Sequence, residues 1–437
     1  MRLESGSRIA VIGGGPAGSF FSYFLLDLAE RAGIHLSVDI YEPRDFSLPA
    51  PKGCNMCAGV ISETLVQNLA TEGINLPASV VQTPISAYVL HTDLGVQRLE
   101  AGSQEKRICA IFRGRGPRGM REVDSSGFDE YLLGLAMRKG AKRIPKRVSG
   151  VESRERRLDI RTRDGVREGY DLLAIAAGVN TAALKLFEGG EMKYKPPRTT
   201  KTAIREYFLG REAVEKSFGD CLHVFLLDIP RLDFAMIIPK GDYISVCLLG
   251  KDIDEGLIRA FLTAPEVKGC FPPEWRWDQP GCHCSPSINV GAAVQPYADR
   301  LVFIGDSGVG RLYKDGIGSA YRAAKAAAAC AVLEGVSSED FERYYAPFCR
   351  GTERDNKFGR FIFFMARILQ RVRFLRKALL QVVAAEQQTP GYSPRISSVL
   401  WDAFTGSAPY RDVLLRTLRP AFTGRFVRSL VFSVIGG

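Results

Sequence analysis

The sequence predicts an α/β protein that has a Rossmann-like nucleotide domain, a second domain built on an antiparallel sheet, and a helical C-terminal region. Three observations support this prediction. A glycine-rich turn follows the apolar run 9–12, a Gly-Asp turn follows the apolar run 301–304, and basic and apolar residues alternate at helical spacing near the C-terminus. With 437 residues, of which 46% are hydrophobic, the chain is long enough for two or three domains with a sizeable core.

The first turn has the spacing of the dinucleotide fingerprint, with Gly13, Gly15 and Gly18 between a predicted strand and a helix that begins near Pro16. These glycines permit a sharp turn, a close approach of a pyrophosphate, and close packing of helix on strand. A second strand over residues 36–42 ends at Glu42, where such folds place an acid that accepts hydrogen bonds from a ribose. This frame favours a dinucleotide site over a glycine turn without a ligand.

The second turn favours FAD over NAD. Asp306 follows Gly305 at a strand end, where its carboxylate is placed to accept a hydrogen bond from a ribityl hydroxyl. Gly316 and Gly318 precede an alanine-rich helix predicted over residues 320–333, and they would let the backbone pass close to a flat ring. A helix N-terminus there stabilises negative charge on a reduced flavin. The alternative is an ordinary strand–loop–helix unit.

Both turns, together with three further stretches, carry a resemblance to a known group. Residues 52–62 resemble a Cys-Gly-Gly-Gly loop with Cys57 on the cysteine position, residues 128–141 resemble a Phe-Asp helix, and residues 234–250 resemble a substrate-binding strand pair. The chain thus resembles the FAD-dependent oxidoreductases of the para-hydroxybenzoate hydroxylase fold and, within them, the geranylgeranyl reductase family. The resemblance covers about residues 8–335.

The turns and the resemblance together imply a set of site residues. The expected substrate-binding residues are Phe234, Met236, Ile238 and Pro239, and Cys57 is the candidate catalytic residue. The residues expected at the cofactor are Gly13, Gly15, Pro16, Ala17, Gly18, Glu42, Pro43, Arg44, Cys57, Ala58, Gly178, Gly305, Asp306, Gly316, Ile317 and Gly318.

Some positions depart from the family pattern. Phe234, Met236 and Ile238 replace Tyr, Trp and Phe of the substrate motif, so the pocket would stay apolar with a different shape. Ala177 stands where the hydroxylases carry an Asp, and Ser125 replaces an arginine. The electron donor is therefore NAD(P)H or another reductant.

The resemblance implies a reductase that saturates C=C bonds of a geranylgeranyl-type prenyl lipid, or a similar apolar substrate, by hydride transfer from reduced FAD. Two alternatives stay open. One is a flavin-dependent aromatic monooxygenase or halogenase, and the other is a membrane-docked flavin electron carrier.

The predicted FAD-binding domain is discontinuous and comprises residues 1–80, 110–180 and 287–345. The substrate-binding sheet domain takes residues 81–109 and 181–286, and residues 346–437 form the basic helical region, with a break at 389–394.

The net charge of +11 is concentrated at the C-terminal end, where residues 351–437 carry 14 Lys and Arg against 5 Asp and Glu. Basic residues alternate with large apolar ones over residues 358–377, which is typical of a helix in a membrane interface. A docked helix with a solvated basic face is the alternative, and no nucleic-acid-binding motif is present. We expect a cytoplasmic protein, peripheral to a membrane, because the sequence has neither a secretory signal nor an apolar run of about 18 residues.

The cysteines and histidines give weaker signals. Ten cysteines in a chain of this length do not indicate a disulfide scaffold. Cys54-x-x-Cys57 and Cys282-His283-Cys284 have the composition of a metal or iron–sulfur site, and the first pair alternatively suits a disulfide that exchanges electrons with the flavin. Because nothing brings these segments together, we expect no metal. The histidines lack partner spacing and are expected to be structural; they are His35, His91, His223 and His283.

Overall fold

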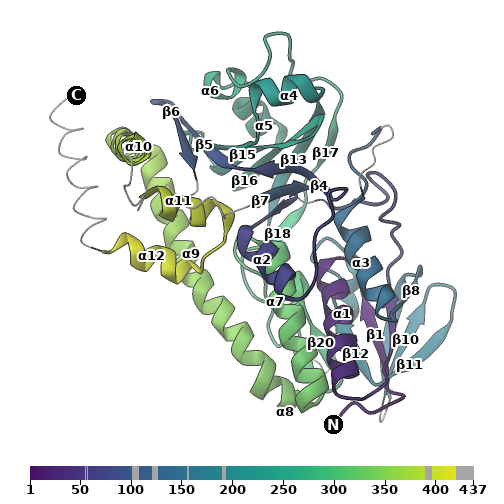
Figure 1. The fold of residues 1–437 in the computed structure, drawn as a ribbon. Coiled ribbons are helices and arrows are strands. Elements are labelled where there is room, and N and C mark those ends of the chain that lie inside the picture. The colour runs from purple at the N-terminus through teal and green to yellow at the C-terminus, as the bar shows by residue number, and fades with distance from the viewer. Residues whose placement is uncertain are drawn as a thin grey trace. The chain divides into compact units, whose positions relative to one another are not determined.

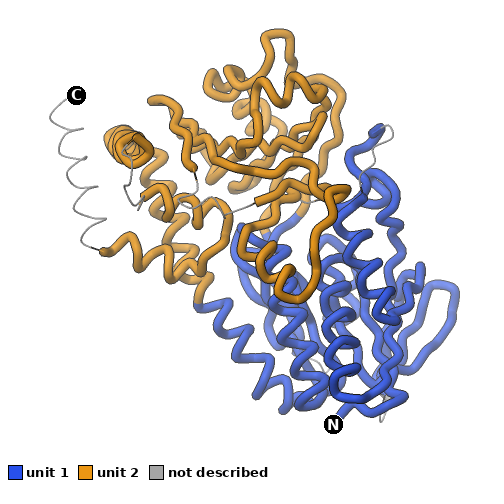
Figure 2. The backbone as a smooth tube through the Cα atoms, in the orientation of Figure 1, with its two compact units in different colours: residues 1–55, 113–199, 287–354 blue, residues 56–112, 200–286, 355–437 orange. Residues whose placement is uncertain are grey.

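The computed structural model describes residues 1–54, 56, 58–100, 108–120, 126–154, 157–188, 193–388 and 396–419. The chain forms two compact units (Figure 2). Unit 1 comprises residues 1–55, 113–199 and 287–354, and unit 2 comprises residues 56–112, 200–286 and 355–437. Residues 56–80 and the helices after residue 355 thus group with the sheet of unit 2.

Unit 1 contains a sheet in the order β19-β20-β12-β1-β2-β8 (Figure 1). Its neighbouring strands run parallel except at the β19 edge. The strands are β1 (Arg8–Ile12), β2 (Ser37–Tyr41), β8 (Lys142–Ile144), β12 (Leu172–Ile175), β19 (Tyr297–Ala298) and β20 (Leu301–Phe303). Since the carboxyl ends of parallel strands meet at one sheet edge, the turns after β1, β2, β12 and β20 lie at the same edge.

Helices and a smaller sheet complete unit 1. The smaller sheet is antiparallel, in the order β11 (Arg167–Tyr170), β10 (Arg157–Thr162), β9 (Val148–Arg154). The helices are α1 (Pro16–Arg31), α3 (Phe128–Arg138), α7 (Gly316–Ala329), α8 (Ser338–Asp340) and the start of α9 (Ala346–Arg371). The prediction that the alanine-rich helix begins at residue 320 is wrong by one turn, because Gly316 and Gly318 already belong to α7, which passes into a π-helical turn at Cys330–Glu334.

Unit 2 is built on a long sheet in the order β17-β13-β16-β15-β14-β5-β6. Neighbours pair antiparallel, as predicted, except that β14 runs parallel to β5. The strands are β5 (Ala87–Thr92), β6 (Gly95–Glu100), β13 (Thr199–Phe208), β14 (Cys221–Phe225), β15 (Leu232–Lys240), β16 (Tyr243–Gly250) and β17 (Cys282–Cys284). A small sheet adds β3 (Val60–Ile61), β7 (Ile108–Ile111) and β4 (Val81–Ile85).

The side chains of this sheet alternate between two apolar clusters, as the period of two in a strand requires. One face carries Tyr88, Leu222 and Phe234, which pack with α10 (Arg373–Gln388) and α11 (Ile396–Thr405). The other face carries Phe225 and Ile237, which pack with α4 (Arg211–Ser217), α5 (Glu255–Leu262) and α6 (Pro265–Lys268). The sheet is therefore covered on both faces within the unit.

The C-terminal helices follow one another as α9, α10, α11 and α12 (Tyr410–Thr417), and α2 (Glu63–Thr71) also belongs to unit 2. Trp401 of α11 joins α2 to this group, because its indole N–H donates to Glu63 Oε1 at 3.2 Å. No helix in the described part of the chain combines the length and the apolar composition needed to cross a bilayer. The predicted break at 389–394 lies outside the described residues.

Candidate functional site

The first glycine turn is packed so tightly that side chains are excluded. Gly13 has φ of +107°, and a Cβ there would lie 2.5 Å from the carbonyl oxygen of Ala176. A Cβ on Gly18 would overlap the carbonyl oxygen of Gly13. The sharp turn between β1 and α1 therefore requires glycine at both positions.

Glu42 holds this turn from the end of β2. Its Oε2 accepts a hydrogen bond from Gly14 N at 2.9 Å, and its Oε1 accepts one from Arg44 N at 2.8 Å. Burial raises the pKa of the Glu42 carboxyl, while the backbone N–H groups of Arg44 and Gly14 oppose that rise in pKa. Glu42 thus links the turn after β1 to the turn after β2. Pro43, which lies between Glu42 and Arg44, is exposed.

The two predicted glycine turns meet inside unit 1. Gly305, with φ of +60°, lies so close to α1 that a Cβ on it would be 2.7 Å from Ala17 Cβ and 3.7 Å from Ala320 Cβ. Tyr321 packs α7 against α1, with ring centroids 5.5 Å from Phe20 and 5.4 Å from Phe24. Segments almost 300 residues apart in the chain therefore share one sheet edge.

The first turns of α1 and α7 present backbone N–H groups at this edge. Gly15 and Asp315 are the N-cap residues, no described side chain forms a cap hydrogen bond on either helix, and neither helix has an acid in its first turn. Pro16, Ala17 and Ile317 are buried there. Helix N-termini of this kind attract anions.

Gly178 adds the turn after β12 to the same edge. Its φ is +68°, a Cβ on it would meet open space, and its N–H donates to Ser307 Oγ at 2.9 Å. Because Ser307 follows Asp306 directly, this hydrogen bond joins the turn after β12 to the turn after β20.

Asp306 is a half-buried acid between two groups that were not predicted from the sequence. Asn289 Nδ2 donates to the Asp306 carbonyl oxygen at 2.9 Å and lies 3.4 Å from its Oδ1. Burial raises the pKa of the Asp306 carboxyl, and the Arg113 guanidinium opposes that rise in pKa. Arg113 is itself held by the fully buried Asp129 through both carboxylate oxygens, with Nη2 to Oδ2 at 2.9 Å.

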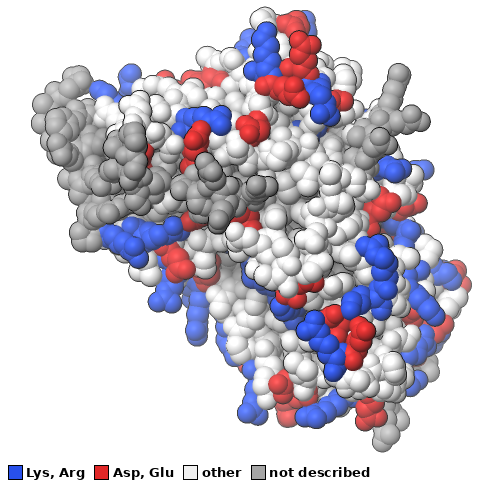
Figure 3. Space-filling view, in the orientation of Figure 1, with Lys and Arg blue, Asp and Glu red and all other residues white. Residues whose placement is uncertain are grey.

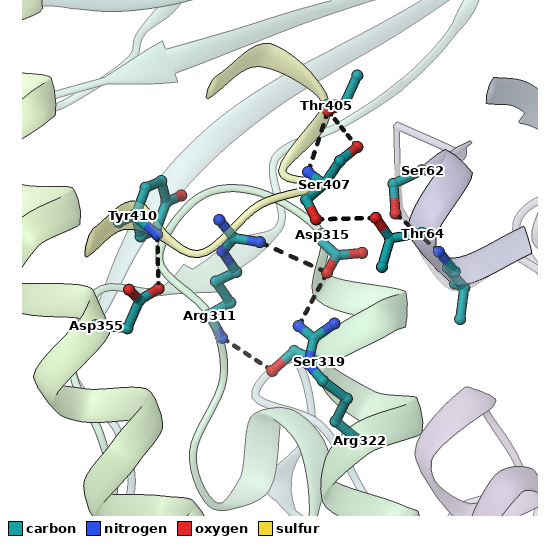
Figure 4. Close-up of polar contacts among 11 residues, drawn as sticks. Ser62, Thr64, Arg311, Asp315, Ser319, Arg322, Asp355, Thr405, Ser407 and Tyr410 are labelled. Carbon is teal, nitrogen blue, oxygen red and sulfur yellow. Dashed lines mark hydrogen bonds and ion pairs between the residues drawn. The ribbon is translucent and has the colours of Figure 1, made fainter. Parts of the chain in front are cut away.

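Charged side chains gather at the N-terminal end of α7 (Figure 4). Arg311 and Arg322 lie 3.8 Å and 2.9 Å from Asp315 Oδ2, and the Arg311 N–H donates to Ser319 Oγ at 3.1 Å. A Cβ on Gly318 would overlap the Asp315 carboxylate, so Gly318 makes room for that side chain, whereas a Cβ on Gly316 would meet open space. Asp315 has φ of +54°, a left-handed conformation of the kind that concentrates at functional sites.

The predicted substrate residues lie on β15 in unit 2. Phe234, Met236 and Ile238 are buried in the apolar cluster that also holds Trp401 and Phe404, with the Phe234 and Phe404 rings 6.0 Å apart. Pro239 ends this run, and Ala58 packs against the same cluster. Cys57 and Ser125 lie outside the described residues.

The loop that follows α11 forms hydrogen bonds with α2. Thr64 Oγ1 donates to the Ser407 carbonyl oxygen at 2.8 Å, and Ser407 N donates to Thr405 Oγ1 at 3.1 Å (Figure 4). Ser62 caps α2 by accepting from Leu65 N at 3.3 Å. The segment that follows Ala58 is thereby joined to the C-terminal helices of the same unit.

Lys240 was not predicted as a site residue, although it follows Pro239 directly. It is 1% exposed, and its Nζ lies 3.2 Å from Glu206 Oε1, which also accepts from Ser245 Oγ at 2.7 Å. A Cβ on Gly59 would lie 3.0 Å from Lys240 Nζ, so this ammonium group touches the segment that follows Cys57 and Ala58.

The cysteines and histidines that were considered as metal ligands do not lie together. Cys54 belongs to unit 1, whereas Cys282 and Cys284 lie on β17 in unit 2, opposite Glu206 and Ile204 of β13. His35 and His283 are exposed. His91 and His223 instead meet each other in unit 2, which their positions in the sequence do not indicate.

No protein-family model and no curated protein matches the sequence. Solved structures resemble the fold. A geranylgeranyl bacteriochlorophyll reductase-like protein from Thermoplasma acidophilum has a TM-score of 0.65 at 15% identity, over 95% of this chain and 98% of that one. A flavoprotein/dehydrogenase from Cytophaga hutchinsonii has 0.62 at 14% identity, over 98% and 99%. Halogenase PltM, in complex with phloroglucinol and FAD, has 0.61 at 12%, over 98% and 91%. The chain thus has the predicted fold, that of the FAD-dependent oxidoreductases.

Proposed function

We propose that this chain binds FAD in unit 1 and uses it to saturate carbon–carbon double bonds of a geranylgeranyl-type prenyl lipid or a similar apolar substrate. The observation that carries the proposal is the contact of Gly305 with Ala17, which unites two distant glycine turns at one sheet edge. Folds of this kind bind dinucleotides at that edge.

The residues of unit 1 fit an adenine dinucleotide. The first turn of α1 offers N–H groups to the pyrophosphate. Arg44 and Arg113 lie close to Glu42 and Asp306 respectively, where their positive charges oppose the rise in pKa that burial causes. Gly178 and Gly316 leave open space where a side chain would otherwise stand. We assign Glu42 to the ribose end and Asp306 to the ribityl end of the cofactor.

The chemistry divides between the cofactor and the protein. Reduced FAD supplies a hydride when bound. An isolated alkene resists hydride attack, so the protein must exclude water and deliver a proton to the second carbon. On the family resemblance, we assign proton delivery to Cys57 and contact with the apolar chain to Phe234 and Met236 of β15. We assign Lys240 a positioning role, because its Nζ lies against the segment at Gly59.

The C-terminal helices supply a membrane-facing surface in this proposal. Phe358, Phe361, Phe364 and Met365 are exposed on α9 at helical spacing, and Phe374 is exposed on α10. Exposed Lys357, Arg371 and Arg373 flank them, and Figure 3 shows Lys and Arg side chains on the surface over α9 and α12. An apolar stripe bordered by cations binds anionic bilayers, where prenyl lipids reside.

The test is a single-turnover reaction without oxygen. The full chain, loaded with FAD and reduced with dithionite, is mixed with geranylgeranyl lipids, and a fully saturated analogue serves as the matched control. We expect the flavin to be reoxidised and the lipid to gain mass in steps of two hydrogens, with neither change for the control. Failure of a range of prenyl lipids to do either would refute the reductase proposal.

The likeness to halogenases favours one alternative, an oxygen-dependent halogenase or aromatic monooxygenase. Substrate-dependent oxygen consumption by the FAD-loaded chain distinguishes it, because saturation of an alkene consumes no oxygen. An electron carrier would reduce a redox partner without changing any lipid. The donor, NAD(P)H or another reductant, is identified by which compound bleaches the oxidised flavin.

A further inference from the structure

Three metal-ligating side chains meet in unit 2, away from the residues assigned above. His91 Nε2 lies 2.9 Å from His223 Nδ1, and Cys270 Sγ lies 3.9 Å from both ring nitrogens of His91. One ligand atom from each residue falls within 4.8 Å of the others. The three come from β5, from β14 and from the segment after α6, so the fold brings together residues up to 179 positions apart.

The pairing of β5 with β14 brings the two histidines together. Because β5 and β14 run parallel with His91 opposite Phe225 and His223 opposite Val89, the two histidines project from the same face. That face is the one covered by α5 and α6, and the chain after α6 places Cys270 over it. Cys270 is half-buried, whereas His91 and His223 are 5% and 6% exposed.

His223 also forms a hydrogen bond with the backbone of Phe218. A hydrogen bond from the protein backbone is a usual support of a metal-binding histidine, because it fixes the orientation of the ring.

We propose that His91, His223 and Cys270 bind a zinc ion. Two imidazoles and a thiolate suit Zn²⁺, and three protein ligands leave a fourth position for water. Zn–N bonds of about 2.0–2.1 Å in a tetrahedron separate two nitrogens by about 3.3 Å. The histidine pair thus needs to open by only a few tenths of an ångström from its 2.9 Å separation.

The surroundings of the three side chains are mainly aromatic. The His91 ring stacks on Phe225 with centroids 4.5 Å apart, and Phe218 meets the His223 ring edge-on at 5.1 Å. The nearby Arg98 opposes a cation, but its side chain is half-exposed and paired with Glu100 at 3.0 Å, which screens its charge. An ion here would join the sheet to the chain after α6.

Binding releases one proton per ion. Without metal the Cys270 thiol donates a hydrogen bond to the Glu266 carbonyl oxygen at 3.3 Å. Zn²⁺ replaces that proton when the Zn–S bond forms. A neutral imidazole that binds a metal through one ring nitrogen keeps its proton on the other, so no second proton leaves.

The experiment uses the full chain stripped of metal by a chelator. Zn²⁺ is titrated calorimetrically in two buffers of different ionisation enthalpy, and Co²⁺ is added as a spectroscopic substitute. We expect one ion and one released proton per chain, a thiolate-to-cobalt charge-transfer band in the difference spectrum, and a higher melting temperature with Zn²⁺. In Cys270→Ala the affinity should fall by about 100-fold or more and the charge-transfer band should vanish.

Cys282→Ser is the matched control, because Cys282 is also a half-buried cysteine of unit 2 and should leave binding unchanged. His223→Gln tests the second ligand, with the far-ultraviolet circular dichroism spectrum as the check on folding. Equal zinc affinity in wild type and Cys270→Ala, loss of binding in Cys282→Ser, or binding of Cu⁺ without any binding of Zn²⁺ would each overturn the proposal.

Discussion

A single methyl group added at Gly18 tests the role of the first glycine turn. In Gly18→Ala the new methyl group overlaps the Gly13 carbonyl, and the turn must open to relieve the overlap. We expect the free energy of unfolding to fall by about 1–3 kcal/mol and the purified protein to retain little flavin. Denaturant titration and the flavin content per chain measure both effects.

Gly134→Ala is the control for that change. Gly134 lies within α3 of the same unit, and its nearest neighbour is the flexible end of Arg138 at 3.4 Å. Alanine is the better helix former, so stability should stay equal or rise by up to about 1 kcal/mol with full flavin content. An equal loss of flavin in both variants would contradict the role given to the turn.

Glu42 makes the stability of unit 1 depend on pH. Burial raises the pKa of its carboxyl above the unfolded value of 4.5, so the native state binds a proton more readily than the unfolded chain. The stability that this proton contributes is present below pH 4.5 and is lost as the pH rises through the folded pKa. In Glu42→Gln that contribution to the slope should disappear, as unfolding of the flavin-free protein between pH 4 and 8 will measure. Identical slopes for the two proteins would contradict it.

Single residues were predictable where the local turn chemistry determines them. Gly13 and Gly18 are such cases, because a sharp turn between a strand and a helix restricts both positions. Arg113 and Asn289 were not predicted, because nothing beside them in the sequence indicates a site. They meet Asp306 only after the strand order places them there.

Among the elements, β15 carries Lys240 of a buried charge pair in unit 2, and a substitution there tests that pair. Lys240→Met removes the ammonium group and leaves the Glu206 carboxylate buried with Ser245 as its remaining neutral donor. We expect a loss of about 3–5 kcal/mol in the free energy of unfolding. The double variant Lys240→Met/Glu206→Leu should regain most of it, because no buried charge is left unpaired. Denaturant unfolding in which the double variant is less stable than the single one would contradict this account.

The α9 helix carries the prediction of membrane binding. Phe361→Ser/Phe364→Ser replaces two exposed rings, 49% and 54% exposed, so it should weaken binding to anionic vesicles without loss of stability. Phe208→Ser is the control, because Phe208 is 59% exposed on β13 instead. Vesicle sedimentation measures the bound fraction. Equal binding by both variants and the wild type would remove α9 from the interface.

Periodicity determined which elements could be predicted. β1 and the start of α1 lie within one residue of their predicted positions, because an apolar run and the glycine turn mark them locally. The β15–β16 pair covers the residues 234–250 that the family resemblance implied. The start of α7 was missed because two glycines are typical of a loop, whereas here Gly318 accommodates the Asp315 carboxylate inside the first helical turn. The parallel β5–β14 pair was missed because sheet order depends on distant partners.

For the whole molecule, the two units hold different proposed sites. Unit 1 holds the proposed FAD site, and unit 2 holds the apolar face of β15 and the His91–His223–Cys270 cluster. A ligand that binds only the folded chain stabilises it in proportion to the logarithm of its concentration, by about 2.7 kcal/mol at 100 times its dissociation constant. Added FAD should therefore raise the melting temperature of flavin-free wild type and leave that of Gly18→Ala unchanged, as a thermal scan at several FAD concentrations will check.

The FAD site of unit 1 is tested most directly by the absorption spectrum of the purified full chain, recorded before and after incubation with FAD and removal of the unbound cofactor. We predict a yellow protein with the two visible bands of oxidised flavin and one FAD released per chain on denaturation. A protein that stays colourless after this reconstitution would contradict it.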